Sequence, residues 1–516
     1  MKNGFLIRKN QYYDSVFLMG FNSRIMGTKG VQQSAVLMAT DTNKEVLVNL
    51  GFHSADFQTA TPNDLIIAVI ADTQSVLNEL FANVDHSLTE VRGTKTVSNL
   101  HSLSEALEAK PAANLTVISV PGEFAAYEAK KSLEAGVNVF LFSDNVPVED
   151  EISLKKYAYE HGLLVMGPDC GTSLLQGIGI GFANSVRKGN IGAIAAAGTG
   201  LQEFTCMVHN QGYGISHAIG AGGRDLSDAV IGLTTLSALD ILDQDSKTDV
   251  IAIIAKLPGE KSLGLLIEKI KQCRTPVIGC FLGIRNSIDG EEVIFKRAKT
   301  IDEAVFLAIR QIDKERSTSP EPMPPLPLKS GYTPQRWLPE QRYLRGIFAG
   351  GTFCYQSQEI LNKMGIDINS NAPLDKHLKL QHPDFSKEHT IVDMGDDFYT
   401  VGKPHPMIDS TQRKLRILTE ANDPQVAILL LDFILGYNSS KDPVGELIDS
   451  IQAAQMIFNK RGGHLTVVAS ICGTDGDSQD ITMQTKLLNE AGVVVFNSNA
   501  QATEYCGNLI NGGLRR

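Results

Sequence analysis

Short apolar runs alternate with amphipathic stretches along the chain up to about residue 315. Each run is short, often β-branched and bounded by Gly, Pro or Asp, which is typical of a buried strand. Residues 103–109 and 124–135 place apolar side chains three and four positions apart, so we expect helices there, the second ending at Gly136. Strands joined through helices by right-handed crossovers form parallel sheets, which we therefore expect. The expected strands are residues 36–38, 65–70, 115–120, 137–142, 163–166, 191–196, 250–255 and 276–282.

A proline-rich segment interrupts this pattern. Residues 317–339 hold seven of the 20 prolines in the chain. Proline cannot donate a backbone hydrogen bond, so a segment this rich in proline predicts an extended linker, which we place at residues 316–344. The length of 516 residues indicates roughly three to four domains in total.

An internal repeat spans the linker. Residues 192–199 read Gly-Ala-Ile-Ala-Ala-Ala-Gly-Thr and residues 346–352 read Gly-Ile-Phe-Ala-Gly-Gly-Thr, so in each copy an apolar strand runs into a glycine turn. Further apolar strands follow at similar spacing in both halves. The repeat predicts two doubly wound domains of one fold. Each copy continues with a glutamate and a glycine turn, which are Glu203 and Gly212 in the first and Glu359 and Gly365 in the second.

Composition narrows the class of protein. The net charge of −11 and the isoelectric point near 5.5 argue against a nucleic-acid partner, because such partners require clustered Lys and Arg. The seven cysteines lack C-x-x-C spacing and fit reduced thiols in a cytosol. No apolar run approaches the roughly 18 residues of a membrane-spanning helix. We therefore expect a cytoplasmic protein with no membrane partner.

Three glycine-rich loops follow expected strands and precede expected helices. In a parallel sheet, ligands gather at the carboxyl ends of strands, where helix N-termini expose amide groups and attract anions. Each glycine can also serve only as a tight turn, but several loops of the same type favour phosphate binding. The loops are Gly198-Thr199-Gly200, Gly350-Gly351-Thr352, and Gly436 with the donors Asn438 and Ser439.

Two further segments carry candidate chemistry. Arg224 ends a glycine-rich loop, where it is suited to bind a carboxylate or phosphate, or alternatively to pair with the nearby Asp225 or Asp228. In residues 393–409, Pro404 and Pro406 flank His405, and we expect this histidine to act as a hydrogen-bond donor or general acid/base. Asp396 in the same segment and Arg413 after it are further candidates for substrate binding. No metal centre is predicted, since no His/Cys ligand spacing accompanies the carboxylates.

Several motifs resemble one enzyme family. Residues 96–307 resemble the α subunit of succinyl-CoA synthetase, and residues 346–510 resemble the C-terminal domain of its β subunit, fused in one chain. The motifs are Val-Pro-Gly-Glu-Phe at 120–124, Gly-Pro-Asp-Cys-Gly at 167–171, the glycine strand at 192–199 and Gly-x-Gly-Gly at 220–223. With Gly-Asp-Asp at 395–397, Gly-Lys-Pro-His-Pro-Met-Ile-Asp at 402–409 and Leu-Leu-Leu-Asp at 429–432, the chain is identified as a member of the FdrA family.

The resemblance implies a multi-domain α/β architecture. A small N-terminal α/β domain is expected at 1–95 and a Rossmann-like domain of CoA-binding type at 96–188. The first and second ligase-like domains of flavodoxin type are expected at 189–315 and 345–516, on either side of the linker.

The chain departs from the synthetase in ways that limit the chemistry. The synthetase phosphorylates a histidine in a Gly-His-Ala-Gly-Ala loop, whereas residues 285–292 read Arg-Asn-Ser-Ile-Asp-Gly-Glu-Glu. The glycine turn for the CoA phosphates and the ATP-grasp domain have no counterpart. We therefore expect no phosphohistidine relay, and no residue pattern supports CoA or Mg²⁺ as a cofactor.

Members of the FdrA family are associated with allantoin catabolism as a subunit of oxamate carbamoyltransferase. The resemblance implies phosphorolysis of oxalurate to oxamate and carbamoyl phosphate, which a carbamate kinase would then use. By this resemblance the glycine loops hold phosphate, Arg224 or Arg413 holds the oxalurate carboxylate, and His405 or Glu203 handles the proton. Glu203 matches the glutamate that supports the phosphohistidine in the synthetase. Backbone N–H groups would stabilise the oxyanion.

Two alternatives remain open at the level of sequence. The first is an acyl-CoA ligase, which needs a phosphorylatable residue and a CoA pocket. The second is a non-catalytic subunit that keeps the fold without the chemistry. In each case we expect partner subunits and an oligomer.

Overall fold

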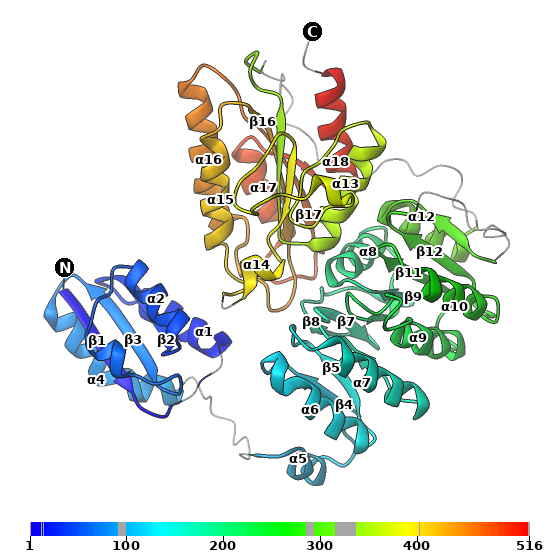
Figure 1. Cartoon of the computed structure of the whole chain (residues 1–516), viewed down its shortest axis with the longest axis horizontal. Coiled ribbons are helices and arrows are strands. Elements are labelled where there is room, and N and C mark those ends of the chain that lie inside the picture. Colours follow the sequence, from blue (N-terminus) through cyan, green and yellow to red (C-terminus); the bar gives the residue numbers. More distant parts are fainter. Residues whose placement is uncertain are drawn as a thin grey trace. The chain divides into compact units, whose positions relative to one another are not determined.

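The chain folds into two units, residues 1–105 and residues 106–516, in a computed structural model (Figure 1). The structure describes residues 2–11, 13, 15–90, 100–284, 294–314, 337–401 and 403–513. Most of the predicted linker and all of the segment 285–292 lie outside the described residues. Within the described part of the chain, no helix has the length and apolar character that crossing a membrane requires.

The first unit is built on a three-stranded antiparallel sheet in the order β1-β3-β2. The central strand β3 buries alternate residues in two separate clusters, Leu65 and Ile67 on one face and Ile66 and Ala68 on the other. Because both faces are covered, β3 reads as a continuous apolar run. The antiparallel pairing corrects our expectation of a parallel sheet here. Its elements are β1 (Lys2–Arg8), α1 (Ser15–Met26), β2 (Val31–Met38), α2 (Asp41–Asn49), α3 (Asp56–Thr59), β3 (Leu65–Ala71) and α4 (Gln74–Glu90), and α5 (Leu103–Ala109) follows.

The second unit opens with a small parallel sheet in the order β4-β5-β6. Gly136 follows α6 with a φ of +76°, a conformation that glycine adopts without strain and that commonly ends helices. The elements are β4 (Leu115–Ile118), α6 (Gly122–Glu134), β5 (Asn138–Leu141), α7 (Val148–Glu160) and β6 (Val165–Met166).

A seven-stranded sheet follows, in the order β13-β12-β11-β9-β10-β7-β8. Strands β9 to β13 are parallel, and the hairpin β7–β8 adds to them in the antiparallel sense. The hairpin falls within the range predicted for the Rossmann-like domain, but its backbone hydrogen bonds join it to the next sheet. The strands are β7 (Thr172–Leu175), β8 (Ile178–Gly181), β9 (Lys188–Ala195), β10 (Ile215–Gly220), β11 (Val250–Ala255), β12 (Val277–Phe281) and β13 (Lys296–Ala298), and the helices are α8 (Gly198–Asn210), α9 (Leu233–Gln244), α10 (Glu260–Ile270) and α12 (Ile301–Ile312).

The last sheet has five parallel strands in the order β15-β14-β16-β17-β18. Strand β16 buries Leu429 and Leu431 in one cluster and Ile428 and Leu430 in another, because helices cover both faces. The strands are β14 (Tyr343–Phe348), β15 (Thr390–Asp393), β16 (Val426–Ile434), β17 (Thr466–Cys472) and β18 (Val494–Phe496). The helices are α13 (Gly351–Lys363), η1 (Lys376–Leu378), α14 (Asp397–Thr400), α15 (Thr411–Ala421), α16 (Gly445–Lys460), α17 (Ile481–Glu490), α18 (Asn499–Asn508) and η2 (Leu509–Gly513).

The two larger sheets share one strand order. Counted from β9 and from β14, the five parallel strands of each sheet follow the order 2-1-3-4-5, which is the doubly wound order of flavodoxin type. The architecture is therefore α/β and multi-domain with a small N-terminal domain, which confirms the predicted fold class. The predicted linker range extends too far, because Trp337 already donates to Thr466 Oγ1 at 3.0 Å and β14 begins at Tyr343.

Candidate functional site

The first turns of α8 and α13 lie against one another in the second unit. A Cβ at Gly200 would lie 2.9 Å from Thr352 Cγ2, and a Cβ at Gly350 would lie 3.1 Å from Thr199 Cβ. Each helix follows the first parallel strand of its sheet, and neither start has a side-chain cap. Two sets of first-turn amide groups and two positive dipole ends thus lie side by side, an arrangement that favours an anion.

Two buried hydroxyl groups at these helix starts have no partner. Thr172 Oγ1 lies 3.1 Å from the position of a Cβ on Gly198, and Thr352 Oγ1 lies 3.4 Å from that on Gly200. Both atoms are shielded from solvent and form no hydrogen bond within the described residues. An unmade hydrogen bond at a buried hydroxyl costs about 1–3 kcal/mol, so both groups indicate a polar ligand.

Lys256 and Asp393 flank the start of α13. A Cβ on Gly351 would lie 2.7 Å from Asp393 Oδ2 and 3.7 Å from Lys256 Nζ. Burial raises the pKa of Asp393 to about 6, while the neighbouring Lys256 lowers it. We call the first turns of α8 and α13, with Thr172, Lys256 and Asp393, the helix-start site.

The loops around the helix-start site bring a second group of charges together. Burial, followed by the neighbouring Asp144 and Asp397, raises the pKa of Asp169 to about 6, while Lys256 and Arg224 lower it. Burial also raises the pKa of Asp397, and Arg224 opposes this. Loops from all three sheets of the second unit therefore converge at one region.

His405 lies beside Asp393. A Cβ on Gly395 would lie 2.9 Å from His405 Nε2 and 3.2 Å from Asp393 Oδ1. The Nδ1 atom accepts the N–H of Met407 at 3.2 Å, which places the ring proton on Nε2. Burial and the charge of Arg413 lower the pKa of His405 to about 4, so the ring is neutral at pH 7 and can donate a hydrogen bond.

Arg413 is engaged inside the domain, contrary to its expected role as a substrate ligand. Its Nη2 donates to Asp432 Oδ1 at 2.8 Å, to the Asp432 carbonyl at 2.7 Å and to the Ile347 carbonyl at 3.1 Å. Asp432 also accepts the N–H groups of Ala349 and Gly350 at 2.9 and 2.8 Å. The buried ion pair therefore fixes the backbone that leads into α13.

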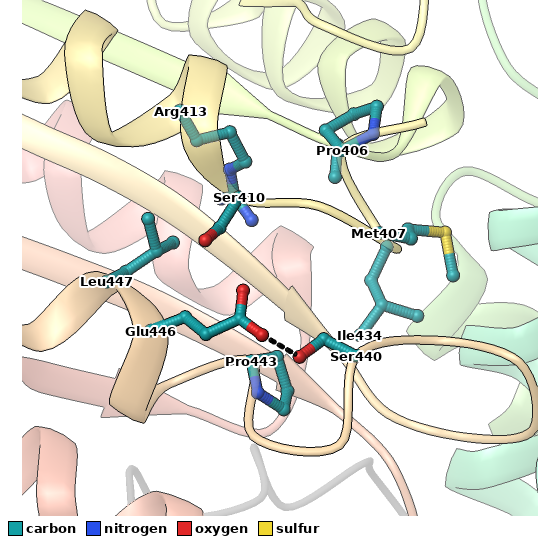
Figure 2. Close-up of a pocket in the computed structure, with 10 residues that line it drawn as sticks. Pro406, Met407, Ser410, Arg413, Ile434, Ser440, Pro443, Glu446 and Leu447 are labelled. Atoms are coloured by element: carbon teal, nitrogen blue, oxygen red, sulfur yellow. Dashed lines mark hydrogen bonds between the residues drawn. The ribbon is translucent and has the colours of Figure 1, made fainter. Parts of the chain in front are cut away.

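A small cavity of about 10 Å³ lies beside this ion pair. Figure 2 shows Ser410, Arg413 and Glu446 around it, with Glu446 accepting a hydrogen bond from Ser440. Ser410 Oγ and Arg413 Nε are buried without a partner among the described residues. The space suits about one water molecule, and it is too small for a substrate.

The loop after β16 differs from its predicted role as a helix start. Gly436 donates its N–H to Gln479 Oε1 at 3.3 Å, and Asn438 Nδ2 donates to the Gly181 carbonyl at 2.6 Å. Ser439 Oγ donates to the Gly436 carbonyl at 2.9 Å. The next helix begins only at Gly445, so the Gly436 loop is not itself a helix start.

Arg224 pairs with a residue that the sequence did not suggest. Its Nε donates to Glu151 Oε2 at 2.9 Å and its Nη2 donates to the Val146 carbonyl at 2.7 Å. Asp225, the expected local partner, instead accepts from Lys155 Nζ at 2.8 Å. The Arg224 side chain remains 48% exposed, which leaves it accessible to solvent.

Glu203 lies one turn inside α8 and not at the helix-start site. Its Oε1 accepts the N–H of Asn499 at the start of α18, at 2.7 Å. Gln356, at the same distance from the start of α13, accepts the N–H of Ile301 at the start of α12, at 3.1 Å. These matching contacts pair Glu203 with Gln356, which corrects the predicted pairing with Glu359.

Asp396 also has a local role. Its Oδ1 accepts the N–H of Phe398 at 3.1 Å and so caps α14. No group of three or more His, Cys, Asp or Glu side chains suited to a metal ion occurs in the described part of the chain.

The sequence pointed to parts of the helix-start site and missed others. It indicated Gly198, Thr199 and Gly200, and the repeat also indicated the start of α13. Lys256 and Asp393 were missed as site residues. Each lies at the carboxyl end of a parallel strand, and that position alone indicates a candidate ligand-binding residue.

Comparison with known proteins defines the class that the fold and site indicate. Residues 347–509 match the CoA-ligase family, and residues 1–102 match a family described as AllF, heavy metal-associated domain. Succinate–CoA ligase [ADP-forming] subunit alpha of Aquifex aeolicus (strain VF5) is 32% identical over 181 residues, which cover 33% of this chain and 57% of that protein. The second unit is thus of the succinyl-CoA synthetase-like, CoA-ligase class.

The family follows from a relative that aligns along nearly the whole chain. Uncharacterized protein YahF of Escherichia coli (strain K12) is 39% identical over 505 residues, which cover 96% of each chain. The chain belongs to this YahF-like family of CoA-ligase domain proteins with an AllF-type N-terminal domain, and membership indicates an enzyme. The apo structure of dinucleotide forming acetyl-coenzyme A synthetase 1 of Ca. Korarchaeum cryptofilum overlaps at a TM-score of 0.33 with 18% identity, covering 77% of this chain and 82% of that one.

The N-terminal residues do not fit a heavy-metal ion. Soft metals prefer thiolate ligands, yet residues 1–102 contain no cysteine, and the first cysteine is Cys170. The histidines there, His53, His86 and His101, are widely spaced in the sequence. We therefore assign no metal chemistry to this domain.

Proposed function

We propose that the chain is a subunit of an oxamate carbamoyltransferase, which phosphorolyses oxalurate to oxamate and carbamoyl phosphate in allantoin (purine) catabolism. The observation that carries the proposal is the helix-start site, where Thr172 and Thr352 offer buried hydroxyls without partners and Lys256 supplies a positive charge. These groups suit orthophosphate. The match of residues 1–102 to the AllF domain supports the assignment.

The proposed reaction needs no covalent enzyme intermediate. A phosphate oxygen attacks the carbamoyl carbon of oxalurate and forms the new C–O bond. The C–N bond to the oxamate nitrogen then breaks, its electron pair remains on nitrogen, and nitrogen takes one proton. The products are carbamoyl phosphate and oxamate, so atoms and charges balance.

Residues near the helix-start site can serve each step. The amide groups of α8 and α13, with Lys256, hold the phosphate, and Arg224 binds the oxalurate carboxylate. Asp393 is suited to deliver the proton, because a pKa of about 6 lies close to neutral pH. His405 donates a hydrogen bond from Nε2 to the oxygen that becomes negative in the tetrahedral intermediate.

A second candidate function is an acyl-CoA ligase, which the CoA-ligase match favours. The relay histidine of the synthetase has no counterpart in residues 285–292, because that segment contains no histidine. A phosphate site without the histidine fits direct phosphorolysis better than a phosphoenzyme relay.

The test is phosphate-dependent cleavage of oxalurate by the purified full chain, alone and with the proteins encoded beside it. We expect carbamoyl phosphate to form, and T352V to abolish most of the activity. T205V is a matched control, because Thr205 is a buried α8 threonine whose hydroxyl already donates to the Gln202 carbonyl at 3.1 Å. The proposal is overturned if no combination forms carbamoyl phosphate while labelled ATP and CoA yield a phosphoenzyme or a thioester.

A further inference from the structure

Two carboxylates of the first ligase-like domain hold the start of α18 in the second. Glu203 on α8 accepts the Asn499 N–H at 2.7 Å. Asp302 on α12 accepts the Ser498 hydroxyl at 2.6 Å and the Gln501 side-chain amide at 3.2 Å. Because Ser498 and Asn499 are consecutive, both carboxylates contact the same end of α18, and the charge of Asp302 acts on Glu203.

The second oxygen of each carboxylate has no hydrogen-bond partner. Glu203 Oε2 and Asp302 Oδ2 are both shielded from solvent and unpaired within the described residues. Two buried carboxylates that act on one another cannot both carry a charge at low cost, whereas a proton on one of them removes a charge.

We propose that Glu203 holds a proton in the folded chain at neutral pH, and that this neutral carboxyl group fastens α18 to α8 through Asn499 and thereby positions the first turn of α8 against α13. Glu203 is in this account a positioning residue that does not touch substrate. The link to phosphate binding rests on the proposed function, but the proton itself does not.

The other half of the repeat supports a neutral side chain at this position. Gln356 on α13 accepts the Ile301 N–H at 3.1 Å and donates its amide to Asn499 Oδ1 at 3.0 Å. The neutral amide of Gln356 therefore holds the start of α12 in the same way as Glu203 holds the start of α18. An uncharged carboxyl group at Glu203 gives both halves the same kind of contact.

The surroundings of the pair favour the protonated form. Burial, followed by Asp302, raises the pKa of Glu203 to about 8, and Asp432 on β16 adds to this, while Asn499 and Gln356 oppose it. Burial also raises the pKa of Asp302, against its hydrogen bonds from Ser498 and Gln501. The other ionisable groups that face the pair are Glu504 on α18, Cys206 on α8, Cys280 on β12 and Cys472 on β17.

The sign of the pH effect follows from proton linkage. The ordinary pKa of Glu203 is 4.5, and in the folded chain it is about 8. Between these values the folded chain keeps a proton that the unfolded chain has released, so this contribution to stability is lost as the pH rises from about 4.5 to about 8. A glutamine at this position has no proton to lose.

The test is thermal unfolding of the full chain between pH 5 and pH 8.5 for the wild type, E203Q and a matched control. We expect the Tm of E203Q to rise relative to that of the wild type as the pH increases. E359Q is the control, because Glu359 is also a buried helical glutamate that accepts a backbone N–H, from Gly283 at 2.9 Å, but it pairs with Lys363. Its Tm is expected to run parallel to that of the wild type.

Parallel curves for E203Q and the wild type overturn the proton on Glu203. Should E203Q fail to fold, D302N provides the same comparison from the other partner, with the same expected rise. Orthophosphate titrations at pH 7.5 and pH 9 form a second readout, in which the wild type loses more affinity than E203Q. A wild type that binds no phosphate at either pH contradicts the proposed function, while the unfolding data still decide on the proton.

Discussion

Replacing Arg413 with methionine separates a structural role from a substrate-binding role. The Arg413 side chain is 5% exposed and that of Asp432 is fully buried, with 2.8 Å between Nη2 and Oδ1. Methionine keeps much of the volume but removes the cation and its hydrogen bonds. Asp432 would then be buried with only the N–H groups of Ala349 and Gly350 to compensate its charge.

The size of the expected loss of stability in R413M follows from the burial of the Arg413–Asp432 ion pair. Removing one partner of a buried ion pair typically costs about 3–5 kcal/mol, because the remaining charge is uncompensated. For a domain of 150–250 residues, each kcal/mol lowers Tm by about 2–4 °C, so R413M should lower it by about 6–20 °C. Asp432 also fixes the start of α13, so phosphate affinity should fall as well.

The assay is thermal and urea unfolding of the full chain, followed by orthophosphate titration of the folded protein. K486M is a control with a Lys486 side chain 73% exposed, and it should change stability by less than about 0.5 kcal/mol. If R413M unfolds like the wild type while the KM for oxalurate rises, Arg413 is a substrate ligand and not a structural residue.

Three further predictions concern the helix-start site. D393N should lower kcat for phosphorolysis by about 10²–10⁴-fold. The wild-type rate should fall above pH 6 as Asp393 loses its proton, whereas any residual D393N rate should not fall there. A pH–rate profile with the same shape in D393N and the wild type would contradict Asp393 as the proton donor. T352V should raise the Kd for orthophosphate by about tenfold or more, because a hydrogen bond to a charged group is lost, and calorimetry measures this directly. K256M should weaken phosphate binding and make it less sensitive to salt, since it removes a charge at the site; equal salt slopes for variant and wild type would count against Lys256 as a ligand.

The larger helices and strands could be predicted because the residue pattern of each one matches both its secondary structure and its burial in the fold. Strand β16 is apolar apart from Asp432, since helices cover both of its faces, and the apolar run alone identified it as a strand. Strand β7 was missed, because Thr172–Leu175 is short and mixed. The repeat indicated a common fold, which the shared strand order confirms.

The site was predictable only where its chemistry shows in local sequence. Glycine turns at Gly198 and Gly351 mark helix starts in any parallel sheet, so the repeat found both. A lone lysine such as Lys256 looks like a surface residue until the fold places it beside α13. The Gly436 loop was predicted to bind phosphate, but its N–H and amide donors bond to Gln479 and Gly181. These partners are far away in the sequence, so no local pattern reveals them.

The partner of Glu203 was also beyond local inference. Its contact with Asn499 spans 296 residues and depends on how the two ligase-like domains pack. The sequence suggested a catalytic proton carrier, whereas the structure places the carboxyl group against the start of another helix. Tertiary packing, and not residue type, decides which of these roles is available.

A crystal structure of the full chain soaked with tungstate, an anomalous scatterer with the shape and charge of phosphate, tests the helix-start site most directly. We expect an anomalous peak between the first turns of α8 and α13, within hydrogen-bonding distance of Thr172 and Thr352 and close to Lys256. An empty space there in crystals that bind tungstate elsewhere would contradict the claim that these helix starts form the anion site.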